Sequence, residues 1–156
     1  MFKVILVFFG LFIAGCNANE SYIDPLKPQL ETVSFDVVQK SLNIKSNLPN
    51  HLLNLLNQWF DNRVKVNGFD GNMILTISEY SEKISSISDG KKVDIYLAFN
   101  IVLNKSSNTQ TKIIKGDVSS YGTLTGNFSL QEFDIVIQNT QSDLLLRLSR
   151  DLKSKI

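Results

Sequence analysis

The sequence offers little from which to build a catalytic or metal site. The chain of 156 residues has one cysteine, Cys16, and one histidine, His51. A single cysteine cannot form a disulfide within the chain, and a single histidine cannot supply a paired-histidine metal site. His51 stands among leucines in the first turn of an expected helix, where we interpret it as a solvated or capping residue. We therefore expect no metal and no cofactor.

The acidic residues do not suggest catalysis either. Glu79 and Glu82 are three residues apart on an expected strand, so their side chains point to opposite faces and cannot share a substrate. The glycine-containing segment at 122–126 lacks the Lys-Ser/Thr pair of a phosphate-binding loop. We predict that the protein is not an enzyme. A periplasmic hydrolase or inhibitor is a further hypothesis, and it would require a concave pocket with clustered polar groups.

The chain also lacks an excess of charge of either sign. It has 16 Lys and Arg against 15 Asp and Glu, and Lys3 lies before Cys16, so the part from Cys16 on is formally neutral. A general nucleic-acid binder needs a basic face, which a neutral domain does not provide. Three prolines, eight glycines and 43% hydrophobic residues suit one globular domain with a real core, which we place at 30–156.

The N-terminus combines one cation, an apolar run and small residues before the cysteine. Residues 1–15 therefore predict a signal peptide that is too short to be a membrane span. Ile13-Ala14-Gly15-Cys16 resembles the bacterial lipobox, which implies lipidation of Cys16 (palmitate among the acyl groups) and cleavage before it. The alternative is a small buried cysteine. In such lipoproteins Asp after the cysteine favours the inner membrane. Asn17 instead predicts an outer-membrane anchor, with the domain at the periplasmic face.

Residues 16–29 are polar and contain Pro25 and Pro28, which predicts a lipidated N-terminus followed by an extended tether. The alternative is a loop packed on the domain through its apolar residues. These are Tyr22, Ile23 and Leu26.

Periodicity assigns the elements of the domain. Alternating apolar residues predict strands at 31–39, 72–83, 91–105 and, as a weaker edge strand, 113–126. Leu42 and Ile44 either extend the first strand or fold over the core as a loop. Apolar residues three and four apart predict helices at 47–64, with Asn47 or Asn50 as cap, and at 130–153, opened by a Ser129-x-x-Glu132 capping box. Asp89-Gly90 predicts a hairpin between the second and third strands.

The element order is strand, helix, three strands, helix. Two amphipathic helices need one apolar surface to cover, so we predict an α+β two-layer sandwich, β-α-β-β-β-α, with a four-stranded, mostly antiparallel sheet and both helices on one face. The opposite face is expected to be polar or to meet a partner. Tyr80, Tyr96 and Ala98 are assigned to it.

Six lysines fall near the ends of the expected hairpin strands, where several could gather at one end of the sheet. We interpret them as solvated loop lysines or as contacts for anionic lipid. They are Lys83, Lys91, Lys92, Lys105, Lys112 and Lys115, of which the last five are the candidate lipid contacts.

A lipobox, a short tether, and this order of elements together resemble the LptE family of outer-membrane lipoproteins, and also small proteobacterial lipoproteins of similar layout. The LptE resemblance implies a non-catalytic assembly subunit that plugs the barrel protein LptD and serves lipopolysaccharide transport. This chain is short and ends at its last helix, with no extended tail. The alternatives are an auxiliary lipoprotein of an ABC-type lipid transport system and another periplasmic binding lipoprotein.

Overall fold

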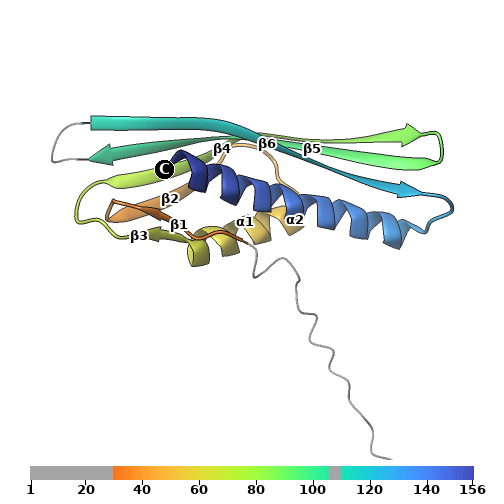
Figure 1. Cartoon of the computed structure of the whole chain (residues 1–156), viewed down its shortest axis with the longest axis horizontal. Helices are drawn as coiled ribbons and strands as arrows, with labels where there is room; N and C mark the ends of the chain where they lie inside the picture. The colour runs from red at the N-terminus through yellow and green to blue at the C-terminus, as the bar shows by residue number, and fades with distance from the viewer. Residues whose placement is uncertain (1–29, 106–109) are drawn as a thin grey trace, which may run out of the picture.

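A computed structural model describes residues 30–105 and 110–156. Figure 1 shows a twisted sheet above a layer that contains both helices. The elements in chain order are β1 Val33–Phe35, β2 Gln39–Ile44, α1 Asn50–Arg63, β3 Val64–Val66, β4 Asn72–Ile87, β5 Gly90–Lys105, β6 Gln110–Thr125 and α2 Leu130–Lys155.

The main sheet has four strands in the order β2-β4-β5-β6. β4 pairs with β5, and β5 with β6, in antiparallel register, whereas the short β2 pairs with β4 in parallel. β1 and β3 form a separate two-stranded parallel sheet. The three long strands have 16 residues each and β2 has six, so β2 accompanies β4 over only part of its length.

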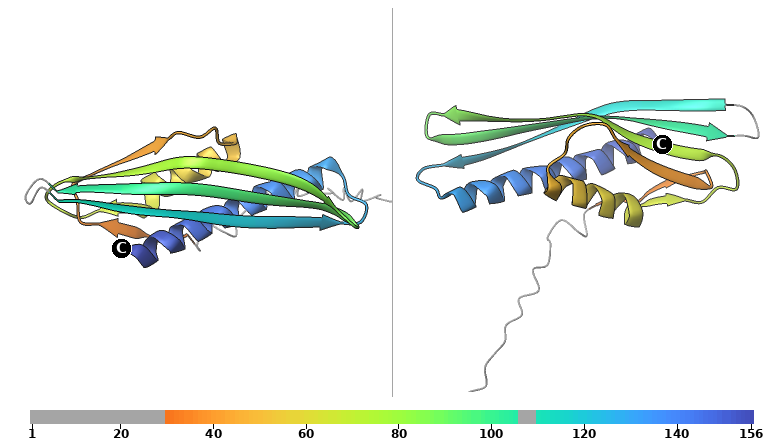
Figure 2. Two further views of the ribbon diagram at one scale, coloured as in Figure 1. Left: turned by 90° about the horizontal axis from the view of Figure 1, so that it is seen from above. Right: turned by 180° about the vertical axis from the view of Figure 1, so that it is seen from behind.

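Both helices lie on the same side of the sheet, and α2 crosses beneath it diagonally (Figure 2). α1 and the β1–β3 pair lie beneath the end at which β4 begins. The apolar stripe of α1 (Leu52, Leu56, Trp59 and Phe60) and that of α2 face a core formed by alternate residues of β4 and β5. The expected α+β two-layer sandwich with both helices on one face is confirmed.

The expected first strand at 31–39 is broken in the structure. β1 ends at Phe35, residues 36–38 form a bend, and the chain enters the main sheet only as β2. The sequence did not decide whether Leu42 and Ile44 lie in a strand or a loop. Both belong to β2 and pack partly buried against the core. Because Val37 is buried in the bend itself, the alternation of apolar residues continues through it and conceals the break.

Tyr80 was predicted on the outer face of the sheet, and this prediction is wrong. The register of β4 against β5 shifts between Ile77 and Glu79, which marks a β-bulge. One extra residue exchanges the faces of every side chain that follows. Tyr80 therefore stands opposite Leu97 on the helix-facing side and packs against the core.

We expected a capping side chain at the N-terminus of each helix, and only α2 has the predicted one. Neither Asn47 nor Asn50 caps α1, because Pro49 occupies the N-cap position and makes no side-chain cap bond. At α2 the capping box is present: the Glu132 amide donates to Ser129 Oγ (3.2 Å) and the Ser129 amide donates to Glu132 Oε2 (2.7 Å). These bonds satisfy two backbone amides that a helix start leaves free.

β2 is tied to the end of α1 by one lysine. Lys40 Nζ donates to the carbonyls of Phe60 (2.5 Å), Val64 (2.7 Å) and Asp61 (3.1 Å). These carbonyls lie at the C-terminal end of the helix, where a cation is favourable. Burial lowers the pKa of Lys40 from its ordinary value. Lys40 thus fastens the edge strand to the helical layer.

α2 approaches β6 closely because β6 has glycine where they cross. A Cβ at Gly122 would lie 2.3 Å from Thr140 Oγ1 and 2.8 Å from Val136 Cγ1.

At the β4–β5 hairpin, Ser88 and Asp89 form the loop and Gly90, with φ +145°, begins the next strand, so the predicted hairpin is present.

The signal peptide, Cys16 and the tether lie outside the described residues. Within residues 30–105 and 110–156, neither helix has the length and apolarity needed to cross a membrane.

Candidate functional site

In the described part of the chain, no helix lies on the outer face of the main sheet (Figures 1 and 2), and an apolar row crosses this face. Ile74, Val102 and Ile113 stand directly opposite one another on β4, β5 and β6. Ile113 is 57% exposed, whereas Ile74 and Val102 are half-buried by their neighbours. A cross-strand apolar row on a face without helices can serve as a contact surface for an apolar partner.

Polar side chains flank the apolar row on the side where β4 begins. Asn104 Nδ2 donates to Asn72 Oδ1 (3.1 Å), and Thr111 Oγ1 donates to Asn104 Oδ1 (3.0 Å). These residues form one hydrogen-bonded line across three strands. Their remaining donors and acceptors face outward, so this end of the sheet can bind polar groups.

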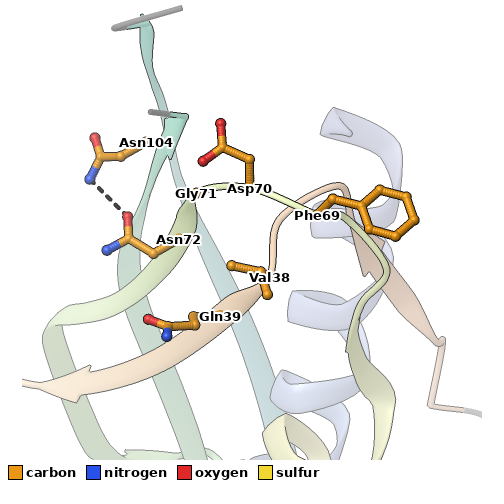
Figure 3. A pocket seen from close by; sticks show the side chains of 7 residues that line it. All are labelled: Val38, Gln39, Phe69, Asp70, Gly71, Asn72 and Asn104. Atoms are coloured by element: carbon orange, nitrogen blue, oxygen red, sulfur yellow. Dashed lines mark hydrogen bonds between the residues drawn. The ribbon is translucent and has the colours of Figure 1, made fainter. Parts of the chain in front are cut away.

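A shallow hollow of about 420 Å³ lies next to this line. Figure 3 shows the Asn72 and Asn104 side chains on one side of it and Val38 in the middle, while the Phe69 ring points away from the two amides. Phe69 is fully exposed. The residues that line the hollow are Val38, Gln39, Phe69, Asp70, Gly71, Asn72 and Asn104. The described residues contain no group of three His, Cys, Asp or Glu side chains that could hold a metal.

Tyr96 and Ala98 lie on the outer face, as predicted. Tyr96 stands opposite Ser81 and Ser119, and Ala98 stands opposite Glu79 and Asp117. Loss of solvent contact, together with the nearby Asp117 and Glu79 carboxylates, raises the pKa of Tyr96. The phenol therefore stays protonated and remains a hydrogen-bond donor on this face.

The candidate lysines do not come together. Lys91 and Lys92 follow the β4–β5 hairpin, whereas Lys105 and Lys112 lie at the other end of the sheet and Lys115 lies between, opposite Asn100. With 16 residues per strand, the two ends are about 50 Å apart. Lys83 lies on the outer face opposite Asp94.

Several of these lysines have local partners. Lys91 Nζ lies 5.9 Å from the centre of the Phe133 ring on the helix side, and Lys92 Nζ lies 2.5 Å from Asp94 Oδ1 on the outer side. Lys105 Nζ forms an ion pair with Asp36. The lysines therefore do not form a single basic patch, and contact of individual lysines with anionic lipid stays a prediction.

Three polar side chains meet where β4 faces α2. Tyr80 Oη donates to Glu82 Oε2 (2.7 Å), and Gln141 Nε2 donates to the same oxygen (3.3 Å). Burial, together with the Glu82 carboxylate, raises the pKa of Tyr80. Sequence reasoning missed this cluster because it assigned Tyr80 to the outer face, away from α2. The bulge places both Tyr80 and Glu82 on the helix side.

The fold resembles those of solved bacterial lipoproteins. It matches rare lipoprotein B from Shewanella oneidensis with a TM-score of 0.51 and 13% identity, over 76% of this chain and 96% of that one. The minor lipoprotein from Acinetobacter baumannii gives 0.45 and 13% identity, over 76% and 94% of the chains. A lipoprotein from Caulobacter crescentus gives 0.43 and 10%, over 73% and 86%. No protein-family model and no curated protein matches the sequence.

Proposed function

We propose that the protein is a lipoprotein anchored in the outer membrane through Cys16, with its domain on the periplasmic side. The domain acts there as a non-catalytic binding and assembly subunit of lipopolysaccharide transport, in the manner of LptE. The observation that carries the proposal is the lipobox-like Ile13-Ala14-Gly15-Cys16 joined to a domain whose fold is that of rare lipoprotein B. Two or more acyl chains provide a stable anchor where one is marginal.

The surfaces of the domain suit a subunit that binds rather than catalyses. The outer sheet face carries the Ile74–Val102–Ile113 row beside a line of amides, and β6 has no second strand neighbour in the described part of the chain. Apolar area and open backbone groups are the features by which a sheet docks on another protein. The partner in this proposal is an LptD-like barrel protein, with lipopolysaccharide as a second ligand.

The anchor is tested with two variants made in the natural host. Cys16→Ser should leave an unlipidated protein that is lost from the membrane fraction, and Asn17→Asp should move a lipidated protein to the inner membrane. Mass spectrometry of the mature N-terminus reports the acyl groups. An unprocessed N-terminus, or an unmodified Cys16, contradicts the anchor.

The assembly role is tested separately by depletion and by cross-linking in intact cells. Depletion should lower surface lipopolysaccharide, and cross-linking followed by purification should recover a barrel protein. Recovery of ABC-transporter components would instead support the lipid-transport alternative. Soluble periplasmic partners alone, with unchanged surface lipopolysaccharide, would contradict the proposal.

A further inference from the structure

β4 is paired on both sides over its first part and on one side over its second. β2 accompanies it from Asn72 to Ile77, where the Lys45 amide donates to the Ile77 carbonyl (3.0 Å). From Glu79 to Ile87 only β5 pairs with it in the described part of the chain. We call residues 79–87 the open edge.

The register determines which backbone groups the open edge presents. In an antiparallel ladder, successive residues point their N–H and C=O groups alternately to one neighbour and to the other. The tight hairpin closes on the Ile87–Gly90 pair, so Ser86, Ile84, Glu82 and Tyr80 direct their backbone groups away from β5. The same four side chains lie on the helix-facing side, opposite Lys91, Val93, Ile95 and Leu97.

The layer below the open edge is also incomplete. α1 lies beneath the other end of the sheet, so in the described part of the chain α2 alone passes beneath this one (Figure 2). Ile84 is 47% exposed and Leu130, at the start of α2, is 84% exposed. Gln141 is only 2% exposed, yet its Oε1 has no hydrogen-bond partner among the described residues. An acceptor left unsatisfied in this way favours an incoming donor.

We propose that the open edge binds an extended segment of a partner protein as an added antiparallel strand. Charge defines that segment. A basic side chain stands opposite Glu82 on the helix side, near the free Gln141 oxygen, and an acidic one stands opposite Lys83 on the outer side. An apolar side chain covers Ile84. Read from its N-terminus, the segment therefore has an apolar, an acidic and a basic residue in succession, opposite Ile84, Lys83 and Glu82.

A second copy of this chain does not fit the same site. If two open edges paired with each other, the residue opposite Glu82 would be one of Tyr80, Glu82, Ile84 or Ser86, none of which is a cation. Self-pairing would leave Glu82 without a counter-charge in every such register. The charge pattern therefore opposes pairing of two open edges and favours a segment of a different protein. The identity of that protein rests on the proposed function, whereas the chemistry of the open edge does not.

Two synthetic peptides test the edge chemistry on the full chain purified in detergent. The first is acetyl-Thr-Val-Thr-Val-Glu-Lys-Thr-Val-Thr-amide, and the second exchanges its Glu and Lys. The first should bind at least about fivefold more tightly, because opposite charges across strands stabilise pairing and like charges oppose it. It should also slow amide hydrogen exchange at Glu82, Ile84 and Ser86. Glu82→Lys should abolish the preference, because each peptide then has one attractive and one repulsive cross-strand pair, whereas Glu82→Lys combined with Lys83→Glu should reverse it.

A proline on the edge supplies the matched control. Ser86→Pro removes only an outward N–H, so it should fold normally yet abolish peptide binding. Ser119→Pro is the equivalent change on the free edge of β6, where the Lys115 carbonyl also points outward toward Lys155 Nζ (3.5 Å), and should leave binding unchanged. Equal binding of both peptides, no binding, or protection confined to β6 overturns the proposal.

The two proposals fail separately. If the peptides do not bind but the barrel protein still co-purifies with the Ser86→Pro chain, strand addition is wrong and the assembly role stands. If peptides bind with the expected charge preference but no barrel protein is recovered from cells, the open edge stands and the identity of the partner is wrong.

Discussion

The two halves of β4 both pair with β5, but they differ in their second strand neighbour and in the helices beneath them. Residues 72–77 have β2 on the other side, with α1 and α2 in the layer beneath. Residues 79–87 have no second strand in the described part of the chain and only α2 beneath. The first half buries Met73, Leu75 and Ile77, whereas Ile84 in the second half remains about half exposed.

One strand thus serves two purposes along its length. Burial of Met73, Leu75 and Ile77 on the helix-facing side, together with pairing on both sides, gives the first half the packing that holds the domain together. The second half keeps backbone donors and acceptors available, which an edge can offer to another chain. The bulge between Ile77 and Glu79 marks the boundary, and it also brings Tyr80 and Glu82 onto the helix side.

The largest expected difference between the two halves is in how much the truncation of a side chain lowers the free energy of unfolding. Leu75 is 1% exposed, so Leu75→Ala should lower the free energy of unfolding by about 2–5 kcal/mol. Ile84→Ala removes a half-exposed side chain and should cost less than about 1 kcal/mol. Urea unfolding followed by the fluorescence of Trp59, the single tryptophan, measures both. Equal losses at the two positions would mean that the second half is as well packed as the first.

A smaller effect on the free energy of unfolding is expected at the start of α2. This part of α2 lies beneath the second half of β4, where α1 does not reach. Ser129→Ala removes the acceptor for the Glu132 amide and should cost about 1 kcal/mol. Ser129→Asp retains a capping acceptor and serves as the control. A loss for Ser129→Asp as large as that for alanine would show that the cap is not the cause.

The smallest expected effect is a pH dependence from the same cap. Backbone and side-chain hydrogen bonds from Ser129 lower the pKa of Glu132 below its ordinary value of 4.5. Its stabilising contribution is therefore complete above that value and is lost as the pH falls through the lowered pKa. Glu132→Gln should flatten this part of the stability profile below pH 4.5. An unchanged acid profile in Glu132→Gln would contradict this origin.

Much of the fold was predictable because single-element patterns are strong in this chain. β5 alternates without interruption, α2 combines a capping box with a long apolar stripe, and Asp89-Gly90 indicates its hairpin. These features depend on residues close together in the sequence. The layer arrangement follows because two amphipathic helices must share one apolar face.

The features that sequence missed depend on contacts between distant segments. The β1–β3 pair joins two three-residue strands, too short to show a period, and the bulge adds one residue without any glycine or proline to mark it. For the same reason the amide line at Asn72 and Asn104 was not predicted, since it exists only once the register of β4 against β5 is known. Lys91, Lys92, Lys105 and Lys112 lie near strand ends, but sequence did not show which end, and Lys115 lies between the two ends.

Residue-resolved amide hydrogen exchange of the isolated protein tests the contrast between the two halves most directly. The amides of Met73, Leu75 and Ile77, beside β2, should exchange slowly, and those of Tyr80, Glu82, Ile84 and Ser86 should exchange much faster. Uniformly slow exchange along the whole of β4 would contradict the account, because it would mean that the second half already has a partner.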